Sequence, residues 1–161
     1  MMNKRICQFI LAGAVANALP GSLAVANDES EPLHHASPHH LSVLTGGTAL
    51  VDEDHTAFTL GIDYEYRVSD FLGLGVVVEQ AFGDIDATTL LAVADLHLWR
   101  GFIAQVGPGV EFVDGNSHAA LRLGVLYEVE FENGFTLSPQ LHYDFSHEDA
   151  VVFGFAIGKA F

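Results

Sequence analysis

The chain has 161 residues, half of them apolar, and carries 21 acidic against six basic residues for a net charge of −15. The length fits a single domain. The acidic balance argues against nucleic-acid binding and against electrostatic docking on anionic lipid, because both need basic surfaces. Cys7 is the one cysteine, so an exported form of the chain would be stabilised by means other than disulfides.

Residues 1–26 have the layout of a cleaved export signal. Lys4 and Arg5 precede a mostly apolar stretch, and the sequence AVA at 24–26 is an A-x-A cleavage motif. The apolar stretch is too short and too broken for a spanning helix, which needs about 20 apolar residues. We predict cleavage after Ala26, followed by a flexible His-rich periplasmic segment at 27–40.

From residue 41 onward, strand-like segments alternate with turn signals. Apolar and polar residues alternate with a period of two, which puts one set on each face of a strand. Asp-Gly and Asn-Gly between the segments are strong hairpin signals. We predict eight strands, at 41–51, 56–68, 71–82, 88–99, 101–113, 118–131, 134–145 and 150–161.

The predicted connections alternate in length. Short turns facing the periplasm and longer loops facing outward are typical of outer-membrane barrels, and an even strand number puts both ends of the barrel on the periplasmic side. Pro108 and Pro139 fall inside strands, where each removes a ladder donor, and we expect bulges to absorb them. The short connections are 69–70, 100–101 and 133–134, and the longer acidic ones are 52–55, 83–87, 113–118 and 146–149.

The last strand shows the alternation most clearly. Its large residues share one parity, its small residues share the other, and the chain ends on an aromatic. This pattern suits a strand with lipid outside and a narrow, filled interior. Outward aromatics also gather near both strand ends, which predicts two membrane-interface girdles. The large set is Val151, Phe153, Phe155, Ile157 and Phe161.

Four segments carry the alternation, the tight turns and the terminal aromatic: LGIDYEYRVSDFLGLG (60–75), VGPGVEF (106–112), LRLGVLYEVEFENGFTLSPQLHYDF (121–145) and FGFAIGKAF (153–161). With them, the chain resembles over 39–161 the small eight-stranded outer-membrane β-barrels of the OmpA-like and opacity-protein type, a porin-like outer-membrane β-barrel domain. The resemblance implies an all-β, eight-stranded antiparallel up-and-down transmembrane β-barrel at 41–161, in the outer membrane of a Gram-negative bacterium.

The resemblance also implies partners. These are outer-membrane lipids and lipopolysaccharide, together with the barrel-assembly machinery, which would engage the C-terminal strand ending at Phe161. Members of this group adhere, bind host factors or stabilise the envelope, so the resemblance names no single activity. We expect a structural or surface-interaction role through the short acidic outer loops, for a ligand that the sequence leaves open.

Charged side chains on inward faces form a candidate lumen network. An eight-stranded barrel is just wide enough for side chains to fill it. Two arginines cannot pair all of the inward carboxylates, so several must lie near the rims, be hydrated, be protonated or bind a cation. A packed polar core is one interpretation, and a narrow cation-selective pore is the alternative. The network is Asp63, Glu65, Arg67, Glu79, Asp95, His97, Glu111, Arg122, Glu128, Glu130, His142 and Asp144.

A histidine cluster precedes the first strand. His34, His35, His39 and His40 have the spacing HH-x3-HH, and neutral imidazoles suit Zn²⁺ or Cu²⁺. Paired histidines in a flexible segment would bind such an ion weakly, because the spacing is not fixed on a rigid element. A polar leader without a metal is the alternative interpretation.

The sequence does not favour an enzyme or a cofactor. His142, Asp144 and Ser146 share one face of a predicted strand, but successive members lie about 7 Å apart, too far for a catalytic triad. A soluble periplasmic ligand-binding barrel, in the manner of lipocalins, would need an apolar interior and a polar exterior. The predicted faces are the reverse.

Overall fold

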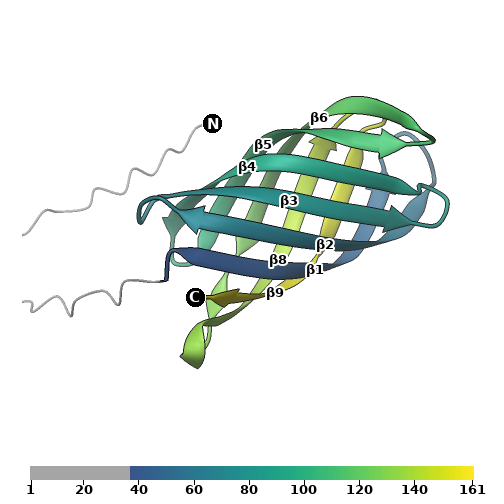
Figure 1. Cartoon of the computed structure of the whole chain (residues 1–161). Coiled ribbons are helices and arrows are strands. Elements are labelled where there is room, and N and C mark those ends of the chain that lie inside the picture. The colour runs from purple at the N-terminus through teal and green to yellow at the C-terminus, as the bar shows by residue number, and fades with distance from the viewer. Residues whose placement is uncertain (1–36) are drawn as a thin grey trace, which may run out of the picture. The chain divides into compact units, whose positions relative to one another are not determined.

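One closed antiparallel sheet forms a barrel (Figure 1). The structure is a computed structural model that describes residues 37–161, so the predicted signal peptide and the segment 27–36 lie outside the described residues. No helix within the described part is long and apolar enough to cross a membrane. The strands are β1 (His39–Leu50), β2 (Thr56–Arg67), β3 (Leu72–Phe82), β4 (Ala87–Trp99), β5 (Phe102–Val113), β6 (Asn116–Tyr127), β7 (Val129–Glu130), β8 (Phe135–Phe145) and β9 (Ala150–Ala160), with a 3₁₀ turn η1 (Glu132–Gly134) before β8.

The strand order confirms the predicted eight-stranded barrel. Neighbours pair in chain order from β1 to β6, β1 also pairs with β9, and β6 pairs with β8, which closes the sheet. The short β7 continues β6 along the same edge of β8, so the two together occupy one strand position. Closure leaves no open sheet edge, which is what a sheet in lipid requires.

Side chains alternate between the two faces of the wall as predicted. In β9, Phe155 and Ile157 are 57% and 61% exposed, while Ala156 between them is 1% exposed. In this strand, large apolar side chains therefore lie on the outside and small ones on the inside. This arrangement is the reverse of a soluble ligand-binding barrel and matches a lipid-facing exterior.

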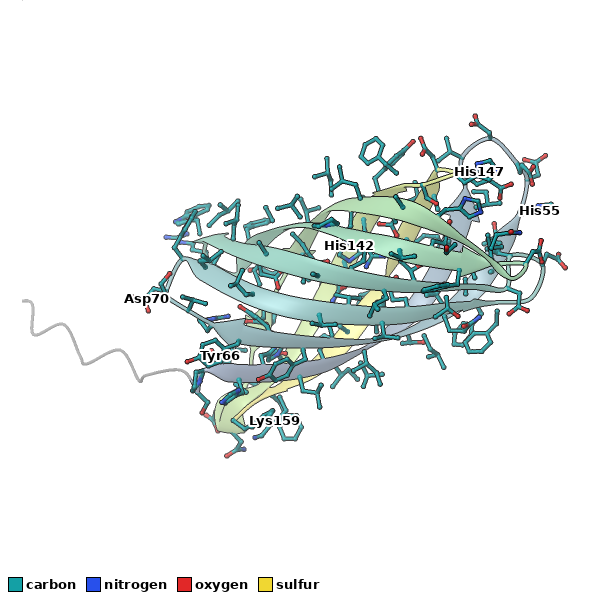
Figure 2. The ribbon with its side chains drawn as sticks, turned by 45° about the horizontal axis from the view of Figure 1, so that its top comes forward. His55, Tyr66, Asp70, His142, His147 and Lys159 are labelled. Carbon is teal, nitrogen blue, oxygen red and sulfur yellow. The ribbon has the colours of Figure 1, made fainter. Side chains whose placement is uncertain are left out.

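The connections gather at two ends. We call the end with the connections 51–55, 83–86, 114–115 and 146–149 the loop end, and the opposite end the turn end. His55 and His147 lie at the loop end, and Asp70 and Lys159 lie toward the turn end (Figure 2). The turn end also holds the start of β1 beside the C-terminus, where His39 and Phe161 exchange backbone hydrogen bonds of 3.3 and 2.9 Å.

The two predicted aromatic girdles are present on the outer surface. At the loop end, Phe58 stacks on Phe82 with ring centroids 6.2 Å apart. At the turn end, Phe102 contacts Tyr127 at 4.8 Å. All four side chains are exposed, as expected for rings that sit at a membrane–water interface.

One predicted loop is much shorter than expected. The prediction of a four-residue connection within 113–118 is wrong, because Asp114-Gly115 forms a two-residue turn and Val113 pairs with Asn116. Both turn residues have positive φ, 50° and 76°. Asp-Gly adopts this left-handed conformation at low cost, which lets the hairpin close tightly.

The two prolines interrupt the hydrogen-bond ladders between strands and do not form the predicted bulges. Pairing of β6 with β8 stops opposite Pro139, which has no amide hydrogen, and resumes in β7 in unchanged register. In the gap, Glu128 donates its amide to the carbonyl of Gly101 at 2.7 Å. The strand predicted at 118–131 is therefore two strands. The β4–β5 ladder also skips Pro108 without a register change there.

Candidate functional site

The centre of the lumen is closed by an ion-pair cluster on three strands, Glu79 of β3, Arg122 of β6 and Asp144 of β8, which we call the central cluster. Arg122 is 0% exposed. Its two terminal nitrogens donate to the two carboxylate oxygens of Glu79, each at 2.6 Å. Its Nε and Nη2 donate to Asp144 at 2.7 and 2.6 Å. Because β4 and β5 separate β3 from β6 in the sheet, the Arg122–Glu79 pair crosses the interior.

Small residues make room for this cluster. A Cβ at Gly61 would lie 2.7 Å from Cγ of Glu79. Between the central cluster and the turn end, buried apolar side chains fill the lumen, among them Leu44, Val77 and Leu91. Two bidentate ion pairs and a packed apolar layer therefore occupy the barrel centre.

His142 lies beside the central cluster and is also buried. Its Nε2 donates to Oε1 of Gln140 at 2.9 Å. Its Nδ1 has no partner among the described residues and lies over Gly124, where an added Cβ would be 2.0 Å away. The alternation in β8 predicts that Gln140 faces inward, but Gln140 carries no charge and was not part of the predicted lumen network.

A second polar group lies toward the turn end. Arg67 donates from Nη2 to Nδ1 of His97 at 3.2 Å, and Nε2 of His97 donates to Oε1 of Glu65 at 2.7 Å. Arg67 Nε also lies 3.6 Å from the same oxygen. The His97 ring therefore lies between Arg67 and Glu65 and contacts both. Glu65 thus has both a cation and a hydrogen-bond donor.

Two inward carboxylates, the buried Asp95 and the half-buried Asp63, lie next to this group without such partners. Nε2 of Gln105 donates to Oδ2 of Asp63 at 3.2 Å and to Oδ1 of Asp95 at 2.9 Å. Oδ1 of Asp63 and Oε1 of Gln105 are buried and have no hydrogen-bond partner in the described chain. The sequence pointed to both carboxylates but missed Gln105, which shares their inward parity but carries no charge.

The two histidines of the cluster that lie within the described residues point to opposite sides of the barrel wall. His34 and His35 lie outside the described residues. His39 and His40 are the first residues of β1, two positions before the predicted start of the strand, and so face opposite sides of the wall. Outside, Nδ1 of His39 lies 2.7 Å from the Tyr64 hydroxyl. Inside, Nε2 of His40 lies 2.8 Å from Oγ1 of Thr136 and 3.6 Å from Glu128.

These two rings do not converge on one point, so they cannot share an ion in this arrangement. Over residues 37–161, no three side chains of the types His, Cys, Asp and Glu gather as a metal site. The metal-binding interpretation of the four-histidine cluster stays a prediction that depends on the segment before β1.

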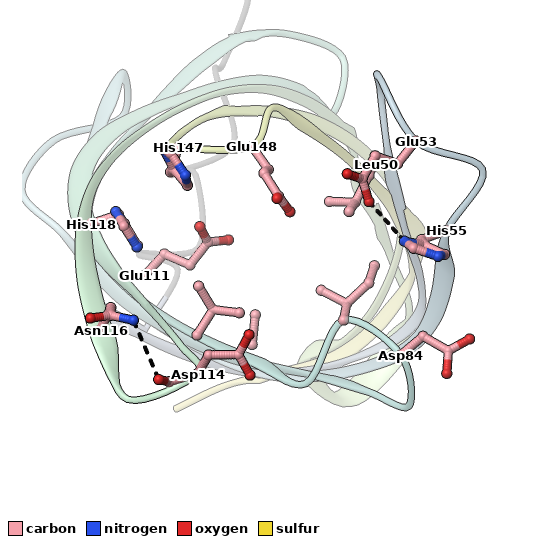
Figure 3. Close-up of a pocket in the computed structure, with 13 residues that line it drawn as sticks. Leu50, Glu53, His55, Asp84, Glu111, Asp114, Asn116, His118, His147 and Glu148 are labelled. Carbon is pink, nitrogen blue, oxygen red and sulfur yellow. Dashed lines mark hydrogen bonds and ion pairs between the residues drawn. The ribbon is translucent and has the colours of Figure 1, made fainter.

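The loop end opens into a cavity of about 390 Å³ (Figure 3), which we call the acidic cup. Its floor is apolar, formed by Leu50, Ile85, Ala87 and Val113. Within the described chain, neither Lys nor Arg lines it. Its carboxylates are Glu53, Asp84, Glu111, Asp114 and Glu148.

Histidines and hydrogen bonds order the wall of the acidic cup. The rings of His118 and His147 stack with centroids 4.7 Å apart and an interplanar angle of 11°. The Ser146 hydroxyl donates to Oε2 of Glu111, and His55 pairs with Glu53 at 2.9 Å. The predicted lumen residue Glu111 thus belongs to the cup, whereas Glu130 is exposed at the turn end.

Comparison with known proteins identifies the fold. No family model matches the chain, and no curated protein matches its sequence. The N-terminal β-barrel domain of Pseudomonas aeruginosa OprF aligns with a TM-score of 0.60 and 13% identity, over 78% of this chain and 99% of that chain. The chain has the fold of an outer-membrane β-barrel.

Two further structures share this fold. Neisserial surface protein A (NspA) aligns with a TM-score of 0.56 and 12% identity, over 78% of this chain and 99% of that chain. A de novo designed transmembrane β-barrel aligns with a TM-score of 0.54 and 18% identity, over 76% of this chain and 96% of that chain. Identities this low carry the fold and not an activity.

The side chains considered for a catalytic triad make separate contacts in this barrel. Each has its own partner: Gln140 for His142, the central cluster for Asp144 and Glu111 for Ser146. The polar residues form three distinct groups instead. These are the acidic cup, the central cluster and the polar group toward the turn end, and the cup is the one that is open to a large partner.

Proposed function

We propose that this protein is a bacterial outer-membrane barrel, exported by a cleaved signal, that presents the acidic cup at the cell surface to a cationic partner. The observation that carries the proposal is the cup itself, an open cavity with five carboxylates above a lumen closed by the central cluster. The apolar outer surface and its two aromatic girdles support insertion in a membrane.

The orientation is inferred from the chain ends, because connection length does not distinguish the two ends of the barrel. The turn-end connections 68–71, 100–101 and 131–134 are about as long as the loop-end ones. Both ends of the barrel chain lie at the turn end, which is the periplasmic side in bacterial barrels with an even strand number. The loop end then faces outward. A cation with an apolar portion fits the cup best, because its charge would meet the rim carboxylates while its apolar part covers Leu50, Ile85 and Val113. Rim charges of this kind act mainly on association rate and specificity.

Binding of a cationic amphipathic peptide tests the cup. We expect the folded barrel to bind a synthetic peptide of Lys and Leu, and the variant Asp84→Asn/Glu148→Gln to bind it several-fold more weakly. The difference should shrink as salt is raised, because exposed charges are screened. Isothermal titration against the refolded barrel in non-ionic detergent measures both quantities.

The matched control is Asp70→Asn/Glu132→Gln, which removes the same charge from exposed positions at the turn end. This variant should bind the peptide as the unaltered protein does. Equal weakening in both variants would mean that net charge, rather than the cup, attracts the peptide, and the proposal would then fail.

A cation-selective pore is the alternative that the inward carboxylates leave open. The central cluster weighs against it, because its ion pairs lie across the path. We expect planar bilayers containing the protein to be electrically silent. Steady single-channel currents whose cation preference falls in the variant Glu65→Gln/Glu128→Gln would establish the pore instead.

A further inference from the structure

We propose that the turn-end half of the lumen contains a Ca²⁺ site held by Asp63 and Asp95. The two carboxylates come from β2 and β4, and one amide, Nε2 of Gln105, bridges them at 3.2 and 2.9 Å. Asp95 and Gln105 are 4% and 3% exposed. The site lies apart from the acidic cup and does not depend on the cup's function.

Both carboxylates lack a compensating positive charge. Each arginine in the lumen is already engaged, since Arg122 bonds to the other two members of the central cluster and Arg67 bonds to Glu65 and His97. Gln105 supplies a neutral donor only. An ionised carboxylate that is buried without a cation is strongly disfavoured.

The orphaned oxygens point to a ligand. Oδ1 of Asp63 and Oε1 of Gln105 are buried acceptors without a donor in the described chain. Asp63 and Asp95 also line a cavity of about 20 Å³, together with the hydroxyl-bearing Ser42 and Ser138. A space of this size holds one water-sized species. The lining also includes the oxygen-bearing Glu65, Glu128 and Gln140, beside the apolar Ile103 and Leu126. Oxygens are the ligands of hard cations.

Charge and size favour Ca²⁺ among such cations. Two carboxylates balance a divalent ion, and neutral hydroxyl and amide oxygens complete a Ca²⁺ shell of flexible geometry. Mg²⁺ gives up its waters reluctantly, and a cavity for one water-sized species has no room for them.

The site lies beside a further cavity that is nearer the turn end. A second cavity of about 20 Å³ near the mouth, lined by Pro38, Arg67 and Glu130, shares His40 and Glu128 with the first. The buried apolar layer and the central cluster close the lumen beyond the site. The site therefore lies on the turn-end side of these packed residues.

Retention of Ca²⁺ by the folded, full-length barrel tests the proposal. The refolded protein is equilibrated with Ca²⁺, passed through a desalting column in metal-free buffer and analysed for bound calcium. We expect the unaltered protein to retain one Ca²⁺ per barrel and Asp63→Asn/Asp95→Asn to retain none. The cup variant Asp84→Asn/Glu148→Gln should retain the ion, which separates the lumen site from weak surface binding.

Three results would overturn the proposal. The first is no retained Ca²⁺ in the unaltered protein, and the second is equal retention in the Asp63→Asn/Asp95→Asn variant. The third is a variant that unfolds at a higher temperature than the unaltered protein in Ca²⁺, which would mean that the carboxylates are held protonated. If Asp63→Asn/Asp95→Asn does not fold, the cup variant Asp84→Asn/Glu148→Gln is used for the test instead. The unfolding temperature of the cup variant should then rise when Ca²⁺ is added and stay unchanged when Mg²⁺ is added. An equal rise with both ions would contradict the Ca²⁺ site.

Discussion

Replacing Arg122 by methionine should lower the free energy of unfolding by about 3–5 kcal/mol, the usual cost of leaving a buried charge without its partner. The side chain is fully buried and makes four short hydrogen bonds to Glu79 and Asp144. Methionine fills similar space but donates nothing, so two carboxylates would face each other in the lumen. Urea unfolding of the barrel in phospholipid vesicles, followed by the fluorescence of Trp99, measures the loss.

Two further variants define this effect. Lys159→Met removes a cation that lies over the ring of Phe135 at the turn-end rim, and it should leave stability nearly unchanged. Adding Glu79→Gln and Asp144→Asn to Arg122→Met should recover much of the loss, because no charge is then left unpaired. A loss below about 1 kcal/mol for Arg122→Met alone, the range of an exposed ion pair, would show that the cluster is hydrated rather than buried.

Replacing Gly46 by valine should hinder closure of the barrel between β1 and β9. Gly46 pairs with Gly154 across this seam, and a Cβ at Gly46 would lie 2.0 Å from the carbonyl oxygen of Phe153 and 2.7 Å from Cα of Gly154. Both are backbone atoms, so a side chain forces the strands apart at the cost of overpacking, about 1–3 kcal/mol or more. We expect a lower unfolding midpoint and a smaller folded fraction on an unboiled gel.

The neighbouring glycine supplies the control. A Cβ at Gly47 would meet the far end of the Phe153 ring at 3.0 Å and a carbonyl of Ala57 at 3.3 Å. The ring faces the outside and can move, so Gly47→Ala should fold nearly as well as the unaltered protein. Equal folding of Gly46→Val and Gly47→Ala would refute the close approach at this seam.

Most of the fold could be predicted from the sequence, because the wall of a barrel depends on local patterns of alternation and turn residues. Alternation in β9 separated Phe155 and Ile157 from Ala156 correctly, since each strand has one lipid-facing and one lumen-facing side. The errors lie where turn residues or a proline change the local geometry, and at the predicted two-residue turn 69–70, which is the four-residue connection 68–71 in the structure. Asp114-Gly115 made a tight turn from an expected loop, and Pro139 divided one strand into β6 and β7.

The contacts between side chains within the lumen could not be predicted from the sequence. Parity shows that Arg122 and Glu79 both point inward, but they belong to strands that are not neighbours, so their contact depends on the tilt and stagger of the closed barrel. Neutral residues such as Gln105 carry no charge signal. The same limitation applies to His39 and His40, which share a motif in the sequence but lie on opposite faces of β1.

The most direct test of the central claim, that this chain forms a closed barrel in the outer membrane, is heat-modifiability of the protein in isolated outer membranes. Boiled and unboiled samples are compared on a denaturing gel after fractionation. Our account predicts a compact, faster-migrating unboiled band in the outer-membrane fraction, because a closed hydrogen-bonded barrel resists detergent until it is heated. A single band in the soluble periplasmic fraction would contradict it, and would mean that the apolar outer surface does not face lipid.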